Sequence, residues 1–169
     1  MILVLAGQGR STRSAMGNDK DTYFVAVKVF LLDSEERFLI TKDIFGSWDI
    51  PGGRLREQDF NIPLEGVAER KIKEELGEAV EYKFGKPVIF MRHEREEVLS
   101  SEKKEKRRIF AVGYTASYKG GTIKLGKNHE KFEWVSVKDF KPEGYFTGGW
   151  LKGVKDFQAG YERFMREEK

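Results

Sequence analysis

The chain has 169 residues, of which 39% are hydrophobic and 35% charged, so it is long enough for one globular domain with a single core. Its 31 basic and 28 acidic residues are interspersed, and the net charge of +3 is too small to indicate a nucleic-acid-binding surface. The absence of cysteine excludes disulfides and thiolate metal sites, and it is compatible with a reducing compartment. We therefore expect a cytoplasmic protein.

The first 21 residues differ in character from the rest. In "LVLAGQGRSTR", an apolar run precedes Gly7 and Gly9, which could be a strand followed by a phosphate-binding loop. Such a loop needs a helix after it, whose backbone N–H groups point at the phosphate, and no helix start follows here. The apolar run is also too short to span a membrane, and no basic region precedes it. We interpret residues 1–21 as a flexible or extra segment and residues 22–169 as a single domain.

Apolar runs alternate with turn signals along the remaining chain, which predicts a β-rich domain. Strands are expected over residues 23–32, 37–41, 86–93, 107–118 and 131–137. The charged run at residues 94–107 has no apolar periodicity, so we expect a solvated loop or the tip of a hairpin there. From Trp150 onward, apolar residues recur at steps of three and four, which predicts an amphipathic helix packed on the sheet. Gly153 and Gly160 weaken the prediction that this helix is continuous.

A second helix is predicted from Ile62 to Leu76. Asn61 is a candidate N-cap, Pro63 is tolerated in the first turn, and Gly77 is placed to end the helix. Its apolar residues fall on one broad arc, which should face the sheet.

Charged residues interrupt the apolar arc of this helix. At about 100° per residue, Lys71 and Glu75 project from within the arc, while Arg70 and Glu74 lie at its edge. Carboxylates beside a core are costly unless they are compensated, and a metal ion or a reacting group is a common reason to keep them. Glu74 and Glu75 are therefore candidate functional residues.

The stretch "WDIPGGRLREQDFNIPLEGVAERKIKEELG" resembles the signature of the Nudix hydrolase family, a loop-helix-loop motif that binds Mg²⁺ and diphosphate. The later "HEKFEWVSV" is similar to a further family segment, so the resemblance covers most of residues 22–137. It implies an α/β fold, the Nudix-type α/β/α sandwich around a mixed β-sheet. It also implies hydrolysis of a nucleoside diphosphate linked to another moiety, with Mg²⁺ or Mn²⁺ as cofactor and a small-molecule nucleotide as partner. A homodimer is left open.

The resemblance also assigns roles to individual positions. The implied metal ligands are the Gly52 carbonyl, Glu74 and Glu75. The implied catalytic residues are Glu74, Glu75 and Arg70, the last of which would hold Glu74 in place. The expected substrate-binding residues are Gly53, Lys71, Trp48 and Arg54.

The chain departs from the family signature at several positions. Asp59 stands where the first signature Glu is expected, but the loop from it to Arg70 is longer than in the signature. Lys71 occupies the position of the first helical Glu, and an ammonium cannot ligate Mg²⁺. Glu78 replaces an apolar residue, and Asn128 stands where many relatives carry Glu. We expect Lys71 to pair with Glu75.

Two functions remain open at this point. One is a metal-dependent pyrophosphohydrolase, weakened by these departures, which would need a further carboxylate from Glu57, Asp59 or Glu130. The alternative is a catalytically inactive nucleotide-binding or regulatory domain in which Lys71 contacts phosphate in place of the cation. We expect both histidines, His93 and His129, to be surface or strand residues rather than catalysts. Four aromatic residues could either stack on a base or belong to the core: Phe45, Trp48, Tyr145 and Trp150.

Overall fold

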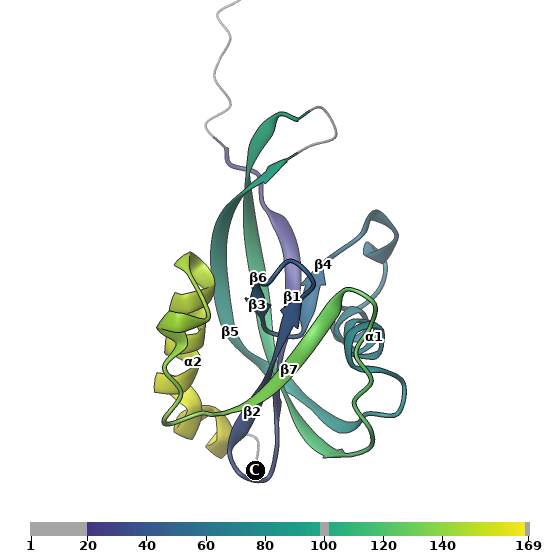
Figure 1. Ribbon diagram of the computed structural model, residues 1–169, viewed down its shortest axis with the longest axis vertical. Coiled ribbons are helices and arrows are strands. Elements are labelled where there is room, and N and C mark those ends of the chain that lie inside the picture. Colours follow the sequence, from purple (N-terminus) through teal and green to yellow (C-terminus); the bar gives the residue numbers. More distant parts are fainter. Residues whose placement is uncertain (1–19, 99–101, 168–169) are drawn as a thin grey trace, which may run out of the picture.

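A computed structural model describes residues 20–98 and 102–167 of the chain (Figure 1). They form a curled mixed β-sheet with helix α1 (Leu64–Leu76) on one side and helix α2 (Gly148–Glu167) on the other, which confirms the predicted α/β architecture. The strands are β1 (Phe24–Leu32), β2 (Arg37–Asp43), β3 (Trp48–Asp49), β4 (Gly52–Arg54), β5 (Glu81–Val98), β6 (Lys104–Gly120) and β7 (His129–Ser136). Short 3-10 turns lie at Glu57–Asp59 (η1) and Pro142–Gly144 (η2). The predicted N-terminal segment lies outside the described residues, apart from its last two positions.

Strand β1 is central to the sheet, whose order is β3-β2-β1-β6-β5, with β4 paired to β1 and β7 paired to β2. It runs parallel to β6, from Phe24 opposite Ile109 to Leu32 opposite Ser117. The pairings of β1 with β2 and β4 are antiparallel. Because both faces of β1 are covered over most of its length, its sequence is nearly continuously apolar rather than alternating.

Alternate residues of β1 face two separate core layers. Ala26 and Phe30 belong to the layer under α2, where the rings of Phe30 and Phe157 stack with their centroids 3.8 Å apart. Val27 belongs to the layer under α1, together with Ile72 of that helix. Each helix therefore buries its apolar stripe on one face of the same sheet.

The predicted solvated loop at residues 94–107 is wrong for most of its length, and the hairpin alternative is the one observed. Strand β5 continues to Val98 and β6 begins at Lys104, so the two form an arm that projects from the body (Figure 1). Glu94 stands opposite Arg108, and Glu94 Oε2 lies 2.9 Å from Arg108 Nε. Strand pairing satisfies the backbone, and Glu94 and Glu96 face basic residues across the ladder, although Arg95 and Glu97 face residues of like charge, so the arm forms without an apolar face.

Helix α1 begins later than predicted, and its N-cap is Pro63 rather than Asn61. The chain before it is held in a turn, since the Ile62 N–H donates to the Asp59 carbonyl at 2.9 Å. Asn61 is part of this turn and cannot cap the helix. The helix ends where predicted, at Gly77, whose φ of 95° suits glycine.

Helix α2 is continuous through both of its interior glycines. A Cβ at Gly153 would lie 2.3 Å from Met91 Sδ, so glycine permits the close approach of α2 to β5. The prediction of an amphipathic helix packed on the sheet is confirmed. Within residues 20–98 and 102–167, neither helix is long and apolar enough to cross a membrane.

Candidate active site

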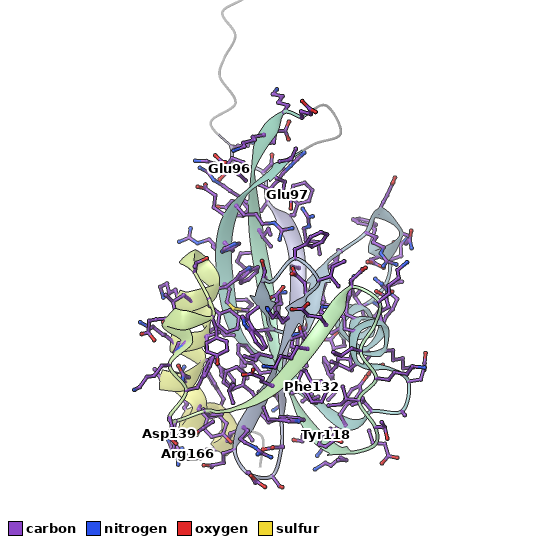
Figure 2. All side chains as sticks on the ribbon, viewed as in Figure 1. Glu96, Glu97, Tyr118, Phe132, Asp139 and Arg166 are labelled. Carbon is purple, nitrogen blue, oxygen red and sulfur yellow. The ribbon has the colours of Figure 1, made fainter. Side chains whose placement is uncertain are left out.

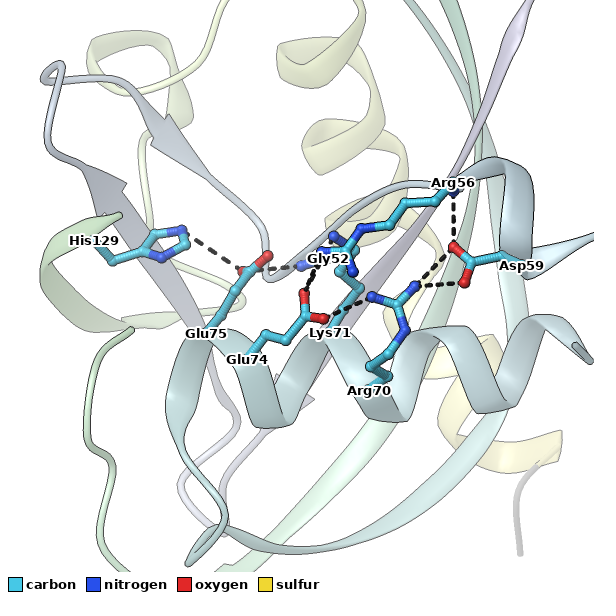
Figure 3. Close-up of polar contacts among 8 residues, drawn as sticks. All are labelled: Gly52, Arg56, Asp59, Arg70, Lys71, Glu74, Glu75 and His129. Carbon is cyan, nitrogen blue, oxygen red and sulfur yellow. Dashed lines mark hydrogen bonds and ion pairs between the residues drawn. The ribbon is translucent and has the colours of Figure 1, made fainter. Parts of the chain in front are cut away.

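The turn between β3 and β4 leads into Gly52, the first glycine of the motif and the first residue of β4, which pairs with β1. Gly52 has a φ of +140°, and a Cβ there would lie 2.1 Å from the Val27 carbonyl oxygen, so the position requires glycine. The Gly52 N–H donates to Glu75 Oε2 at 3.1 Å (Figure 3). This bond joins the beginning of the motif to the end of α1.

Glu75 is a nearly buried carboxylate that faces this turn. Its side chain is 13% exposed, and burial raises its pKa to about 7 against the opposing effects of Lys28 and the Gly52 N–H. Among the described residues, the ion-pair partner within 4.0 Å of Glu75 is His129, whose Nε2 lies 3.7 Å from Glu75 Oε2. Burial lowers the pKa of His129, so this partner is a weak cation near neutral pH. The negative charge of Glu75 is therefore incompletely compensated.

Glu74, in contrast, is surrounded by cations. Arg70 Nη1 lies 2.7 Å from Glu74 Oε1, as its place one turn earlier suggests, while Arg56 Nη2 and Lys71 Nζ lie 3.2 Å and 3.4 Å from Glu74 Oε2. Partial burial raises the pKa of Glu74, but the three cations outweigh it and hold the pKa below its usual value. Glu74 is ionised and already paired.

The predicted pairing of Lys71 with Glu75 is wrong. The Lys71 side chain lies along β4, where a Cβ at Gly53 would be 3.3 Å from both Lys71 Cε and Nζ. From there the ammonium reaches Glu74 rather than Glu75. The absence of a side chain at Gly53 provides the space that the Lys71 side chain occupies.

Asp59 holds the long loop of the motif in place through its hydrogen bonds. Its carboxylate accepts hydrogen bonds from the Arg56 N–H at 2.7 Å and, through both oxygens, from Arg70 Nη2 at 2.7 and 2.8 Å (Figure 3). The Arg56 N–H and the Arg70 guanidinium hold the pKa of Asp59 below its usual value, although burial opposes them. Asp59 thus anchors Arg70, which in turn contacts Glu74.

A pocket of about 530 Å³ lies beside these residues, between α1 and the segment that leads into β7. Its lining includes two carboxylates of α1, Glu74 and Glu75. The other lining residues are Arg56, Lys71, Gly126, Lys127, Asn128 and His129. The structure therefore brings Lys71, Glu74 and Glu75 together at one cavity. The three candidates for a further carboxylate, Glu57, Asp59 and Glu130, do not line it.

Two predicted substrate-binding residues lie away from this pocket. Arg54 is on β4 opposite Ala26, a residue of the layer under α2, and its Nη2 lies 3.0 Å from Glu97 Oε1. The Trp48 ring packs against the core with its centroid 5.1 Å from that of Tyr145.

The other aromatic candidates differ in their exposure to solvent. Phe45, in the turn before β3, is 87% exposed and is therefore not part of the core. Trp150 is part of the layer under α2 and stacks on His93, with ring centroids 4.7 Å apart. His93 is a half-buried residue of β5, which agrees with its interpretation as a strand residue.

Sequence reasoning missed three residues near the site. Lys28 is buried in β1 and lowers the pKa of Glu75. Its position as the one lysine within the apolar run "YFVAVKVFLL" is the sequence signal that could have identified it. Arg56 and Lys127 line the pocket, but nothing in their sequence context distinguishes them from other surface cations.

The carboxylates of α1 are suitable donors for a divalent cation, because Mg²⁺ and Mn²⁺ prefer hard oxygen ligands. Within the described part of the chain, no group of three or more His, Asp or Glu residues is arranged to hold a metal. Mg²⁺ usually binds through one or two carboxylates plus substrate phosphates. The incompletely compensated charge of Glu75 fits such a cation, and Glu74 could join it after exchanging its basic partners.

Comparisons with known proteins agree with this geometry. The family model for the NUDIX domain matches residues 22–151, whereas no curated protein sequence matches the chain. The fold is similar to that of the MutT protein from Methanosarcina mazei Go1, at 21% identity over 87% of this chain and 96% of that chain, with a TM-score of 0.54.

Two further solved structures share the fold. An ADP-ribose pyrophosphatase from Streptococcus suis 89-1591 is 16% identical over 80% of this chain and 91% of that chain, with a TM-score of 0.53. The dihydroneopterin triphosphate pyrophosphohydrolase of E. coli is 14% identical over 83% of this chain and 99% of that chain, with a TM-score of 0.57. Because the family model spans well over half of the chain and includes the loop, the helix and the pocket described above, the chain belongs to the NUDIX domain family.

Proposed function

We propose that this chain is a slow, metal-dependent pyrophosphohydrolase that acts on a nucleoside diphosphate linked to another moiety. The observation that carries the proposal is the buried Glu75 carboxylate, which lacks a full counter-charge at the wall of a cation-lined pocket. Two proteins of similar fold are named as a pyrophosphatase and a pyrophosphohydrolase, which supports a phosphoanhydride as the bond broken.

The proposal assigns roles to several residues in and beside the pocket. Mg²⁺ or Mn²⁺, held by Glu75, Glu74 and the Gly52 carbonyl together with the substrate phosphates, would neutralise the diphosphate and supply an activated water. Arg56 and Lys127 line the pocket as phosphate donors. Arg70, fixed by Asp59, orients Glu74.

One observation favours a second function, in which the chain binds nucleotides without cleaving them. Lys71 Nζ lies 3.4 Å from Glu74 Oε2, at the motif position where a carboxylate would join the metal ligands. In that position the ammonium competes with a metal for Glu74 and could itself donate to a phosphate.

A hydrolysis panel separates the two functions. The protein, at high concentration, is incubated with nucleotide sugars, dinucleoside polyphosphates and nucleoside triphosphates, with Mg²⁺, with Mn²⁺ and with EDTA. We expect slow, metal-dependent release of a nucleoside monophosphate from at least one compound. Tight binding of a panel member in EDTA, with no turnover of any member in either metal, would exclude the hydrolase and support the binder.

A further inference from the structure

A further pocket, of about 490 Å³, lies at the outer edge of the sheet between β5 and the first half of α2. We call it the β5 pocket, and its lining includes Phe90, Arg92, Phe110, Lys152 and Asp156. Strands β6 and β1 lie between β5 and β4, and no residue that lines the pocket beside the α1 carboxylates also lines this one. The proposed function does not use it.

Close packing of α2 on β5 forms one wall of the β5 pocket. A Cβ at Gly149 would lie 1.7 Å from the Arg92 carbonyl oxygen, so the helix lies directly against the backbone of the strand. Lys152 and Asp156 follow on the same side of the helix, line the pocket and form an ion pair with each other. This wall therefore leaves no unmatched charge.

Three exposed aromatic rings form the opposite wall. Phe90, Tyr23 and Phe110 are 67%, 38% and 36% exposed, and the rings of Phe90 and Phe110 stack with their centroids 5.9 Å apart. Phe90 stands opposite Val112, which belongs to the core layer under α1. The rings therefore continue that apolar layer beyond the part of the sheet that α1 covers.

Arg92 supplies an unmatched positive charge beside these rings. It is two residues from Phe90 on β5, so the two side chains point to the same face of the sheet. Within residues 20–98 and 102–167, the Arg92 guanidinium makes no hydrogen bond or ion pair, whereas the neighbouring Arg108 is bonded to both Glu94 and Asp21. The five N–H donors of Arg92 are available to an anion.

The size of the β5 pocket favours a small molecule over a second protein chain. The three rings together expose roughly 300 Å², if each presents about 200 Å² when free. A stable protein–protein interface needs about 800 Å² from each partner. The volume of the pocket, in contrast, is within the range that is usual for small-molecule sites, which are typically lined by aromatic residues and a few polar groups.

We propose that the β5 pocket binds a nucleoside monophosphate, with its base on the Phe90 ring and its phosphate on Arg92. Side chains two residues apart on a strand are about 7 Å apart, which is close to the separation of base and phosphate in a mononucleotide. Every base has a face that stacks on an aromatic ring, and a guanidinium donates two parallel hydrogen bonds to a phosphate. The proposal does not rest on the proposed function, although a nucleoside monophosphate is also the product expected there.

The test follows the backbone amide resonances of the full chain by NMR while AMP is added in EDTA. The amides of Phe90, Arg92 and Gly153 should shift and saturate. Adenosine should cause similar shifts with about threefold weaker affinity, because it lacks the charge that pairs with an exposed arginine. Ribose 5-phosphate, which has the phosphate but no base, should cause no saturable shift at these amides.

Two variants separate the roles of the ring and the charge. Phe90→Leu keeps an apolar side chain but removes the ring, so it should weaken AMP binding at these amides by about tenfold. Arg92→Gln should make AMP bind no better than adenosine and leave adenosine binding unchanged. Arg166→Gln is the matched control, because Arg166 is an exposed arginine in the last turn of α2, away from the pocket (Figure 2). Melting temperatures show whether each variant is folded.

Several results would overturn the proposal. AMP shifts confined to amides around the pocket of the α1 carboxylates, or AMP affinities that folded Phe90→Leu and Arg92→Gln proteins leave unchanged, would show that the β5 pocket holds no nucleotide. A dimer that Phe90→Leu dissociates, with no AMP shift at Phe90, would identify the aromatic rings as an interface between copies of the chain.

Failure of this proposal and failure of the proposed function give different results. Lys71→Gln should leave the AMP shifts at Phe90 and Arg92 unchanged, because Lys71 does not line the β5 pocket. Shifts at these amides in a protein that hydrolyses no member of the panel would reject the proposed function and support the β5 pocket as a separate nucleotide site.

Discussion

At the scale of single residues, the site depends on the contact between Gly52 and Glu75. The Gly52 N–H reaches the carboxylate only because β4 approaches β1 so closely that no side chain fits between them. Glu75 is largely buried beside this contact, and burial raises its pKa to about 7. Backbone packing and carboxylate chemistry are therefore coupled at this position.

Gly52→Ala should destabilise the protein strongly. A Cβ there would lie 2.1 Å from the Val27 carbonyl oxygen, and this backbone atom cannot move without breaking the sheet. We expect the free energy of unfolding to fall by about 3 kcal/mol or more. Gly46→Ala is the control, since Gly46 also has a positive φ but has nothing within 4 Å of its added Cβ, and it should cost only about 1 kcal/mol. Urea denaturation measures both variants. Equal losses of unfolding free energy for Gly52→Ala and Gly46→Ala would contradict the close approach of Gly52 to the Val27 carbonyl.

Glu75 should make stability depend on pH in metal-free buffer. Its pKa is about 7 in the folded protein and near 4.5 when unfolded, so the folded state binds the proton more tightly. The stability linked to this proton is present in full below about pH 4.5 and is lost as the pH rises through about 7.

The Glu75→Gln variant isolates this effect. Between about pH 5 and pH 8, the unfolding free energy of the wild type should fall by up to about 3 kcal/mol relative to that of the variant. Urea denaturation in EDTA across this range measures the difference. Parallel curves for the two proteins would show that Glu75 is not buried as described.

At the scale of elements, the position of α2 depends on its small residues. Gly153 lies over Met91 of β5, and the helix docks there because nothing projects from that position. The apolar spacing of the sequence predicted this helix. Gly153 and Gly160 seemed to argue against a continuous helix, because glycine has a low helix propensity when packing against other elements is left out. Packing against β5 reverses that interpretation.

Gly153→Ala should therefore destabilise the protein although alanine favours helix formation. A Cβ would lie 2.3 Å from Met91 Sδ, and the overpacking should cost about 1–3 kcal/mol. Gly144→Ala, where nothing lies within 4 Å of the added Cβ, should change stability by no more than about 0.5 kcal/mol. Thermal unfolding of both variants measures the difference. A higher melting temperature for Gly153→Ala would show that α2 has room at this position.

The sequence predicted the elements whose structure depends on local pattern. It predicted less well the contacts between residues that lie far apart in the chain. Apolar spacing and turn signals predicted strands, α1 and its end at Gly77, whereas the mixed sheet was implied only by the resemblance to the Nudix family. Local pattern left residues 94–107 open between a solvated loop and a hairpin tip, because the β5–β6 arm depends on cross-strand pairs such as Glu94 and Arg108.

The same limit applies to the candidate site. The helical step correctly placed Lys71 and Glu75 on the inner side of α1, where both side chains are partly or largely buried. It could not show which carboxylate Lys71 meets, because β4 directs the side chain toward Glu74. Lys28 and Arg95 come from other strands, and only the folded sheet brings them near the motif.

At the scale of the whole molecule, the pocket lined by Glu74 and Glu75 and a smaller pocket lined by Lys28, Arg54 and Arg95 lie on opposite faces of one sheet. The larger pocket belongs to the layer of α1 and holds the carboxylates. The smaller one belongs to the layer of α2 and holds an excess of cations. We propose that the larger pocket is a divalent-cation site left incomplete by Lys71.

Lys71→Glu tests this claim most directly. It replaces an ammonium 3.4 Å from Glu74 with a carboxylate at the matching motif position, while Lys73→Glu, on the exposed side of the same helix, makes the same change of charge as a control. Because the new carboxylate destabilises the metal-free site, the melting temperature should fall in EDTA and recover with Mg²⁺.

The decisive measurement is Mg²⁺-dependent turnover of the best substrate in the hydrolysis panel, or of ADP-ribose if the wild type shows none. We expect Lys71→Glu to raise turnover by about tenfold or more, because a missing metal ligand is restored, and Lys73→Glu to leave it unchanged. A Lys71→Glu protein that stays inactive, gains no stability from Mg²⁺ or Mn²⁺ and binds ADP more weakly than the wild type would contradict a divalent-cation site here and identify Lys71 as a phosphate-binding residue.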